Sequence, residues 1–274
     1  MLPRLHQSFS LDLEFPRRFI SRNIIDYKES NKIAWNKHSR RYLEEAGFSN
    51  DILDFGDPRC LSDNDLHLIG DVRNKKILEL GCGGANIGIN LAKRGGLVTA
   101  IDISEQQINH AGEEAKREGL DIHLEVSPIE DYVFHGEYDL IISICVFQYI
   151  DHLDSIFQKT YQHLTSGGTL IFSTNHPAFY TAAYTTIWKD EKEDTEYLDE
   201  RPEVWKWDNR FRDDFTFTSF PHPLEYYINQ LSACGFIIDR MHELMVPHKE
   251  ISTEEEKLET IFPRYLVIKA IKAK

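Results

Sequence analysis

The sequence predicts an α/β fold: a doubly wound, mostly parallel sheet with helices on both faces. Two observations predict it. From Lys75 onward, strand-like apolar runs alternate with helical patterns, which is typical of a parallel sheet covered by helices. Near the end of the chain, two strand-like runs follow one another without a segment clearly long enough to cross over. We therefore expect this last pair to be an antiparallel hairpin.

The expected sheet has seven strands, five parallel and two in the C-terminal hairpin. They are KKILEL (75–80), GGLVTAID (95–102), DIHLEV (121–126), YDLIISIC (138–145), SGGTLIFST (166–174), GFIIDRMHELMV (235–246) and PRYLVIKAIKA (263–273). Ser104 begins a helix with Gln107 three residues later, which is capping-box spacing. Apolar spacing predicts another helix over 153–164. A further helix runs from Leu224 to Cys234 and is ended by Gly235.

Two segments lie outside this core. Residues 1–60 form a helical N-terminal extension, whose candidate inward positions are Ile33, Trp35, Tyr42 and Leu43. Residues 176–222 form an insert after the fifth strand, rich in aromatic residues and carrying the acidic run KDEKEDTEYLDE. Long connections at this edge of a parallel sheet are usually functional. The insert is either a lid over a substrate or a surface for assembly, and both interpretations stay open.

Composition limits the classes of function. The 274 residues carry a formal charge of −14, which disfavours a protein whose main partner is nucleic acid. No apolar run approaches the roughly 20 residues that span a membrane, and the N-terminus lacks the apolar core of a secretory signal. Four cysteines are widely spaced and form no metal-like pair. We therefore expect a cytoplasmic protein without membrane, nucleic-acid or metal partners.

The stretch ILELGCGGANIGINLA (77–92) places a glycine cluster between a strand and a helix. A triphosphate-binding loop would need Lys-Ser or Lys-Thr after the glycines, where Ala85 and Asn86 stand. The dinucleotide fingerprint would need glycine at the position of Asn86. Asp102, at the end of the second strand, is expected in either case because ribose hydroxyls need an acceptor there. Spacing alone therefore does not identify the ligand.

Glu79 narrows the choice. It lies two positions before Gly81 and so places a carboxylate at the mouth of the loop, where it would repel a pyrophosphate. A ligand with a cationic end is favoured instead. S-adenosylmethionine has an ammonium group, a sulfonium and a ribose, and it has no phosphate.

Taken together, ILELGCGGANIGINLA, VTAIDIS, YDLIISICVFQYI and LTSGGTLIFSTNHP resemble the class I S-adenosylmethionine-dependent methyltransferases. The closest likeness is to the small-molecule, type 11/25-like members with an N-terminal helical cap, and NKIAWNKHSRRY matches their preceding helix. The resemblance implies one Rossmann-like domain over 1–274. It also implies methyl transfer from S-adenosylmethionine to a small molecule by direct displacement, with S-adenosylhomocysteine as product.

The resemblance also implies site residues. Glu79, Gly81 and Gly83 would hold the methionine end of the cofactor. Asp102 would accept from both ribose hydroxyls, and Ile103 would pack on the adenine. The adenine amino group would meet the stretch Ser127, Pro128 and Ile129, where Pro128 has no N–H, so that the contact falls to Ile129 or to water. The other expected cofactor-contacting residues are Trp35, Tyr42, Cys82, Gln107, Ile144 and Phe147.

A catalytic residue is harder to name. His176, after the fifth strand, faces the expected substrate mouth, where a neutral imidazole would act as a general base; the alternative is a residue that caps its loop or binds substrate. Three other functions stay open: methylation of protein or RNA, cofactor binding without catalysis, and a nicotinamide-dependent oxidoreductase. The sequence does not indicate the oligomeric state.

Overall fold

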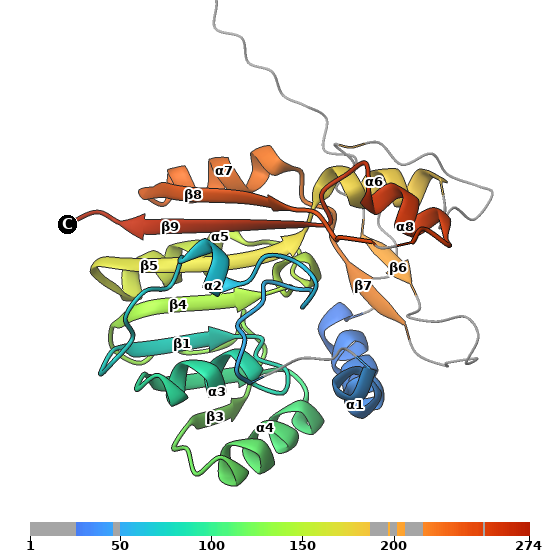
Figure 1. The fold of residues 1–274 in the computed structure, drawn as a ribbon. Coiled ribbons are helices and arrows are strands. Elements are labelled where there is room, and N and C mark those ends of the chain that lie inside the picture. The colour runs from blue at the N-terminus through green and yellow to red at the C-terminus, as the bar shows by residue number, and fades with distance from the viewer. Residues whose placement is uncertain (1–25, 46–49, 187–196, 198–201, 206–215, 249) are drawn as a thin grey trace, which may run out of the picture.

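The computed structural model describes residues 26–45, 50–186, 197, 202–205, 216–248 and 250–274. Its main feature is a seven-stranded sheet in the order β3-β2-β1-β4-β5-β9-β8. The strands are β1 (Lys76–Leu80), β2 (Leu97–Asp102), β3 (His123–Val126), β4 (Tyr138–Ile144), β5 (Leu164–Asn175), β8 (Phe236–Leu244) and β9 (Tyr265–Lys272). Figure 1 shows them side by side, with α1 near the carboxyl ends of β1 and β4.

The register confirms the predicted fold class. The first five strands pair parallel in this sheet, for example Ile77 of β1 with Val98 of β2 and Leu140 of β4. Antiparallel pairing begins at β9, which lies between β5 and β8. Because the carboxyl ends of the parallel strands meet at one edge, the loops that follow them gather there.

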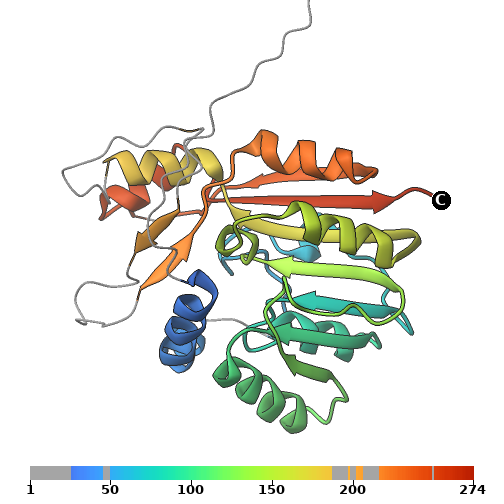
Figure 2. The same ribbon diagram turned by 180° about the vertical axis from the view of Figure 1, so that it is seen from behind.

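Helices cover both faces of the sheet, as Figures 1 and 2 show from opposite sides. One apolar core lies beneath α2 (Asp63–Leu66), α3 (Asn86–Lys93) and α4 (Glu105–Arg117). The other lies beneath α5 (Asp154–His163) and α7 (Leu224–Ala233). The predicted helix ends are close to those found: Ser104 accepts a hydrogen bond from the Gln107 amide, and Gly235 has φ +93° after α7. The doubly wound prediction is confirmed.

The N-terminal helix α1 (Tyr27–Glu45) packs against α4 and β7 (Phe217–Ser219). The prediction that Ile33 faces inward was wrong, since 42% of this residue is exposed. Asn31, Ala34 and His38 are buried instead. Much of the inward face of α1 is polar because it meets backbone groups and a helix terminus, so apolar periodicity misplaced Ile33, whereas Trp35 is half-buried. The side chains of Tyr42 and Leu43 lie outside the described residues.

The insert contributes α6 (Pro177–Thr186) and a two-stranded antiparallel sheet of β6 (Glu203–Trp205) and β7 (Phe217–Ser219). Its acidic run and several of its aromatic residues fall outside the described residues. The Tyr180 hydroxyl hydrogen-bonds that of Ser219 at 2.8 Å, linking α6 to β7. The insert thus reaches α1 through β7.

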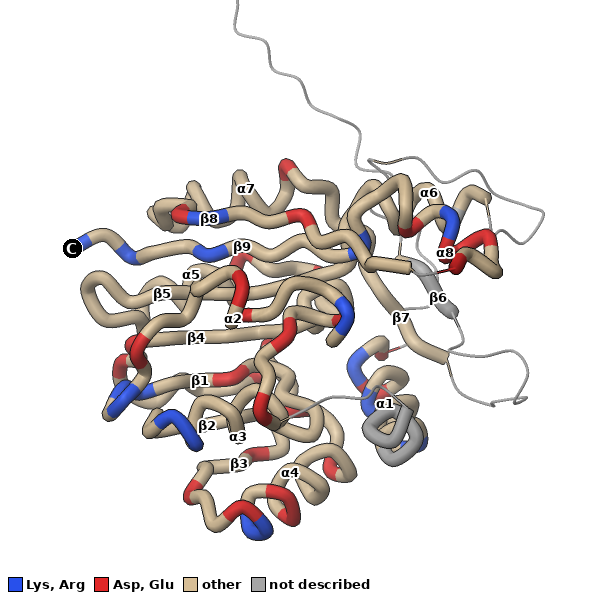
Figure 3. The backbone as a smooth tube through the Cα atoms, in the orientation of Figure 1, with Lys and Arg blue, Asp and Glu red and all other residues tan. Residues whose placement is uncertain are grey.

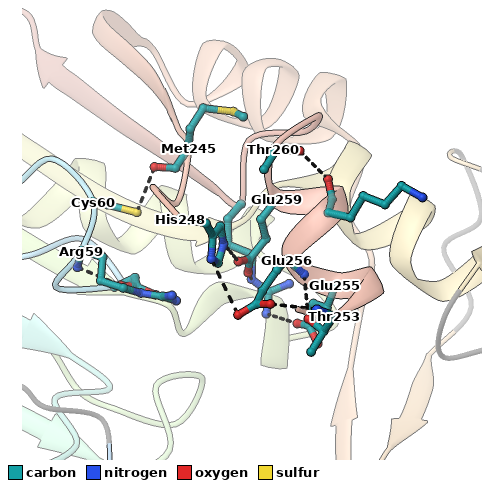
Figure 4. A network of polar contacts seen from close by, with 12 residues as sticks. Arg59, Cys60, Met245, His248, Thr253, Glu255, Glu256, Glu259 and Thr260 are labelled. Atoms are coloured by element: carbon teal, nitrogen blue, oxygen red, sulfur yellow. Dashed lines mark hydrogen bonds and ion pairs between the residues drawn. The ribbon is translucent and has the colours of Figure 1, made fainter. Parts of the chain in front are cut away.

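A polar network holds the segment between β8 and β9 (Figure 4). The side chain of His248 is 4% exposed and contacts Glu259 of α8 (Glu254–Glu259), Nε2 to Oε2, at 2.5 Å. The Cys60 thiol donates to the Met245 carbonyl at 3.4 Å. This bond ties the loop before α2 to the chain just beyond β8.

Candidate active site

A cavity lies at the carboxyl edge of the sheet. It is lined by the glycine loop, the ends of β2 and β4, the loop after β3, the 3-10 helix η1 (Phe147–Tyr149), the first turns of α1 and the segment around Asp54. Ligands of open α/β sheets bind at this edge. The cavity is therefore the candidate site.

The two predicted glycines have different roles. Gly81 has φ +70°, and a Cβ there would lie 2.6 Å from the Val146 methyl groups, so glycine is required for close packing against the loop after β4. Gly83 has φ +53°, and a Cβ there would meet nothing nearer than the Gln107 side chain at 3.9 Å. Both glycines line the cavity, but only Gly83 leaves open space on its side.

Glu79 lies beneath the glycine loop and is 3% exposed. Its Oε2 accepts from the Gly88 amide at 2.9 Å, in the first turn of α3, where a carboxylate is favoured by the helix dipole. Burial nevertheless raises the pKa of this carboxyl to about 8. Glu79 also lines the cavity. A cation in the cavity would favour its ionised form.

Asp102 ends β2 and is also buried. Its carboxylate accepts from the Gly83 amide at 2.8 Å and from the Ser104 amide at 2.9 Å. Burial raises its pKa to about 6. The residue therefore fixes the glycine loop and presents a carboxylate to the cavity at the same time.

The expected adenine side is partly assembled in the cavity. Ile103, Pro128 and Ile129 line it. Ser127 does not appear among the described lining residues; its hydroxyl donates to the Pro128 carbonyl at 3.1 Å. Gln107 lines the cavity, and its buried Oε1 has no hydrogen-bond partner among the described residues. An acceptor atom left in this state is one that a ligand donor would satisfy.

The loop after β4 divides between cavity and core. Ile144, Cys145 and Val146 line the cavity, as does Cys82 of the glycine loop. Phe147 does not: it is fully buried and packs on Phe157 and Phe172, with ring centroids 5.5 and 5.1 Å away. The residues just before Phe147 therefore line the cavity, and Phe147 belongs to the core.

Helix α1 forms one wall of the cavity. Trp35 lines it, and its ring meets those of Tyr149 and Phe217 edge-on, with centroids 5.7 and 4.9 Å away. This wall joins α1, η1 and β7, which are far apart in the chain. Tyr42, the other predicted residue of this helix, cannot be placed because its side chain lies outside the described residues.

His176 lies elsewhere. Its Nδ1 accepts from the Ala178 amide at 3.2 Å, at the start of α6, and its Nε2 contacts Glu243 at 2.8 Å. Burial lowers its pKa, so the ring is neutral. It is not among the described residues that line the cavity. These contacts favour the loop-capping interpretation over the general base.

Several lining residues have no sequence signal. Tyr27, Lys28 and Asn31 come from the first turns of α1, Asp54 from the loop before α2, and Glu130 from the loop after β3. They belong to no motif, and contacts between segments that are distant in the chain bring them together. In the described part of the chain, no group of three or more His, Cys, Asp or Glu could hold a metal ion.

Comparisons with known proteins give the class. A family model described as a methyltransferase domain matches residues 71–217, more than half of the chain. An uncharacterised protein of Haemophilus influenzae is 29% identical over 76% of this chain and 85% of its own length. A ubiquinone biosynthesis O-methyltransferase of Rickettsia canadensis is 31% identical over 55% of this chain, a match that spans 64% of the Rickettsia protein.

The fold gives the same result. A crystal structure from Listeria monocytogenes, assigned to the S-adenosylmethionine-dependent methyltransferases, superposes with a TM-score of 0.63 at 26% identity, over 76% of this chain and 95% of that one. The chain belongs to the methyltransferase domain family. It is a class I enzyme that uses S-adenosylmethionine. The nicotinamide-dependent alternative is therefore dropped.

The cavity fits this cofactor. Glu79 and Asp102 are buried carboxylates without an ion-pair partner among the described residues, and a cationic ligand would supply the missing charge. Gly83 leaves space beside Gln107, whose acceptor oxygen is unused. The bound cofactor supplies a methyl group on a sulfonium. The chain's own residues supply the shape, the acceptors and the exclusion of water.

Proposed function

We propose that the enzyme methylates a small molecule that binds under α1. The observation that carries this proposal is the closure of the cavity from both sides. The Asn31 side chain donates to the Thr218 carbonyl at 3.0 Å and accepts from the Thr218 amide at 2.7 Å, which joins α1 to β7. On the other side, Asn36 accepts from the Ser104 hydroxyl at 2.7 Å, at the start of α4.

Within this cavity, we propose that Glu79 faces the cofactor's ammonium group and that Asp102 accepts from its ribose hydroxyls. Ile103, Pro128 and Ile129 would enclose the adenine. Holding nucleophile, methyl and sulfur in line accounts for much of the rate in such a transfer, because proximity replaces covalent participation by the protein.

A small acceptor is supported by three further points. The name of the Rickettsia relative refers to the biosynthesis of ubiquinone, a small molecule. The net charge of −14 disfavours RNA. In Figure 3, Lys and Arg segments are scattered and interleaved with acidic ones.

No described helix is long and apolar enough to cross a membrane. The four cysteines are free, in keeping with the reducing cytoplasm that we propose as its location.

We further propose that the insert 176–222 is the lid of the acceptor site. Phe217 of β7 supports this, since its ring packs on Trp35, which lines the cavity. The opposing interpretation, an assembly surface, would leave methyl transfer unchanged when the insert is shortened.

The test is the distribution of a labelled methyl group. Purified enzyme and labelled S-adenosylmethionine are incubated with a cell extract divided into small molecules, protein and RNA. We expect label in the small-molecule fraction, in a product that mass spectrometry identifies by the mass of one labelled methyl group in place of a hydrogen. The variant Asp102→Asn is the control for label that is independent of the cofactor site. Label in protein or RNA alone would contradict the proposal.

A further inference from the structure

Among the described residues, nine side chains that line the cavity can gain or lose a proton, and most already have a partner or stay neutral. They are Tyr27, Lys28, Asp54, Glu79, Cys82, Asp102, Glu130, Cys145 and Tyr149. Burial raises the pKa of both thiols, to about 12 for Cys145, so they stay neutral. Burial likewise raises the pKa of both tyrosines, which stay protonated.

The charged groups can be sorted by their partners. Glu130 accepts from the Tyr27 hydroxyl at 2.9 Å and lies 3.9 Å from Lys28, which also pairs with Asp131. Glu79 and Asp102 accept hydrogen bonds from backbone amides at the glycine loop and the helices that follow, at the proposed cofactor site. Asp54 alone of the lining carboxylates is left without an assigned function.

Asp54 is buried, with 3% of its surface exposed, and it lines the cavity. Its Oδ1 accepts from the Gly56 amide at 3.1 Å. It makes no ion pair with any residue in the described part of the chain. A buried carboxylate with one backbone hydrogen bond and a side open to the cavity lacks a polar partner, which a ligand can provide.

The position of Asp54 separates it from the other two acids. Gly56 has φ +135°, and a Cβ there would lie 2.7 Å from the Cys145 sulfur and 2.8 Å from the Tyr265 ring. The loop therefore presses on the end of β4 and the start of β9. The electrostatics support this separation. Burial is the main cause of the raised pKa of both thiols; the charge of Asp54 adds to the effect at Cys145, whereas the charges of Glu79 and Asp102 add to it at Cys82.

We propose that Asp54 contacts the methyl acceptor and takes the proton that its nucleophilic atom loses. The acceptor is then an alcohol, phenol or amine. This inference rests on the proposed function. The nucleophile's lone pair forms the bond to the methyl carbon while the carbon–sulfur bond breaks and its electron pair stays on sulfur. The proton on the oxygen or nitrogen passes to the Asp54 carboxylate, which becomes neutral.

The first test uses binding alone. Sinefungin is a cofactor analogue with a primary amine where the methyl group stands, and S-adenosylhomocysteine has neither group. By calorimetry, Asp54→Asn should weaken sinefungin binding at least tenfold and S-adenosylhomocysteine binding less than threefold. Asparagine can still accept from the Gly56 amide, so the loop should keep its shape. Asp54→Ser is a second variant with the same expectation if the first fails to fold.

Asp57→Asn is the matched control. Asp57 lies in the same loop, pairs with Arg59 at 2.6 Å and is not among the described lining residues. It should change neither affinity more than threefold.

Equal weakening of both ligands would place Asp54 at the shared ammonium group and overturn the inference, as would unchanged binding of both. If the wild-type protein bound neither ligand, the proposed function itself would fail, which is a different result.

The second test uses the acceptor found by the labelled-methyl screen. Asp54→Asn should lower kcat at least 100-fold while the KM for S-adenosylmethionine stays within threefold. With S-adenosylmethionine saturating, so that protonation of Glu79 and Asp102 does not limit cofactor binding, the variant should also lose the acid limb of the kcat–pH profile, where protonation of Asp54 disables the wild type. An unchanged profile would overturn the inference.

Discussion

At the scale of single residues, the site depends on carboxylates that are costly to bury. Glu79 has a pKa of about 8 in the ligand-free protein, against 4.5 for an ordinary glutamate. A raised acid pKa stabilises the fold only while the group is protonated. The contribution is complete below about pH 4.5 and is lost as the pH rises through 8. Ionised Glu79 therefore destabilises the ligand-free fold, and a cationic ligand would offset that cost.

The raised pKa of Glu79 predicts that Glu79→Gln increases the stability of the ligand-free protein and weakens cofactor binding. The amide oxygen can still accept from Gly88 but carries no charge. At pH 9 the ligand-free variant should be more stable than the wild type by about 4–5 kcal/mol, a gain that falls below about 1 kcal/mol near pH 5. It should bind S-adenosylhomocysteine at least tenfold more weakly. Denaturant unfolding at both pH values and calorimetry measure the two effects; a variant less stable at pH 9 would contradict the argument.

The same scale shows what the sequence could predict. Glu79 and Asp102 lie near the carboxyl ends of β1 and β2, and the glycines follow β1. Because these strand ends must meet at one edge, the motif places all of them in the cavity. Asp54 precedes α2 in a loop without a motif, and the close approach of Gly56 in that loop to Cys145 brings it there. His176 was expected near the site from its place after β5. The turn into α6 directs its ring instead to Ala178 and Glu243.

At the scale of elements, polar contacts as well as aromatic ones hold α1 at the cavity. Its apolar pattern did not show which face is buried, because Asn31 satisfies a backbone pair of β7 and Asn36 caps α4. The strands and the helices of the core were easier to predict, because they bury continuous apolar stretches. The lining provided by α1 depends on partners that are distant in the chain.

We therefore predict that Asn31→Ala loosens α1 and speeds the release of the cofactor product. The substitution removes two hydrogen bonds, each worth about 1 kcal/mol. S-adenosylhomocysteine should leave about tenfold faster, as measured by stopped-flow fluorescence of Trp35, which lines the cavity. Ser30→Ala is the control, since Ser30 makes one longer bond to Thr216, at 3.3 Å. Equal release rates for Asn31→Ala and wild type would show that α1 does not limit exit.

At the scale of the whole molecule, the sheet and its hairpin were predictable because period and turn signals are local, while the closure over the cavity was not. The closure requires α1, η1 and β7 to meet, and they are separated by more than 60 residues at each step. Their meeting point is the wall of Trp35, Tyr149 and Phe217. Local sequence patterns do not predict contacts between segments so far apart in the chain.

The cavity as a whole should discriminate between ligands that share an adenosine. S-adenosylhomocysteine brings an ammonium group to a cavity with buried, unpaired carboxylates, whereas NAD brings a pyrophosphate that Glu79 and Asp102 would repel. At 100 times its Kd, S-adenosylhomocysteine should stabilise the fold by about 2.7 kcal/mol. For a chain of this size that corresponds to a rise in Tm of roughly 5–10 °C. NAD at the same concentration should shift Tm by less than about 1 °C, because a ligand that does not bind the native state cannot stabilise it. Thermal unfolding with each ligand measures both shifts, and equal shifts would mean that charge at the glycine loop does not select the ligand.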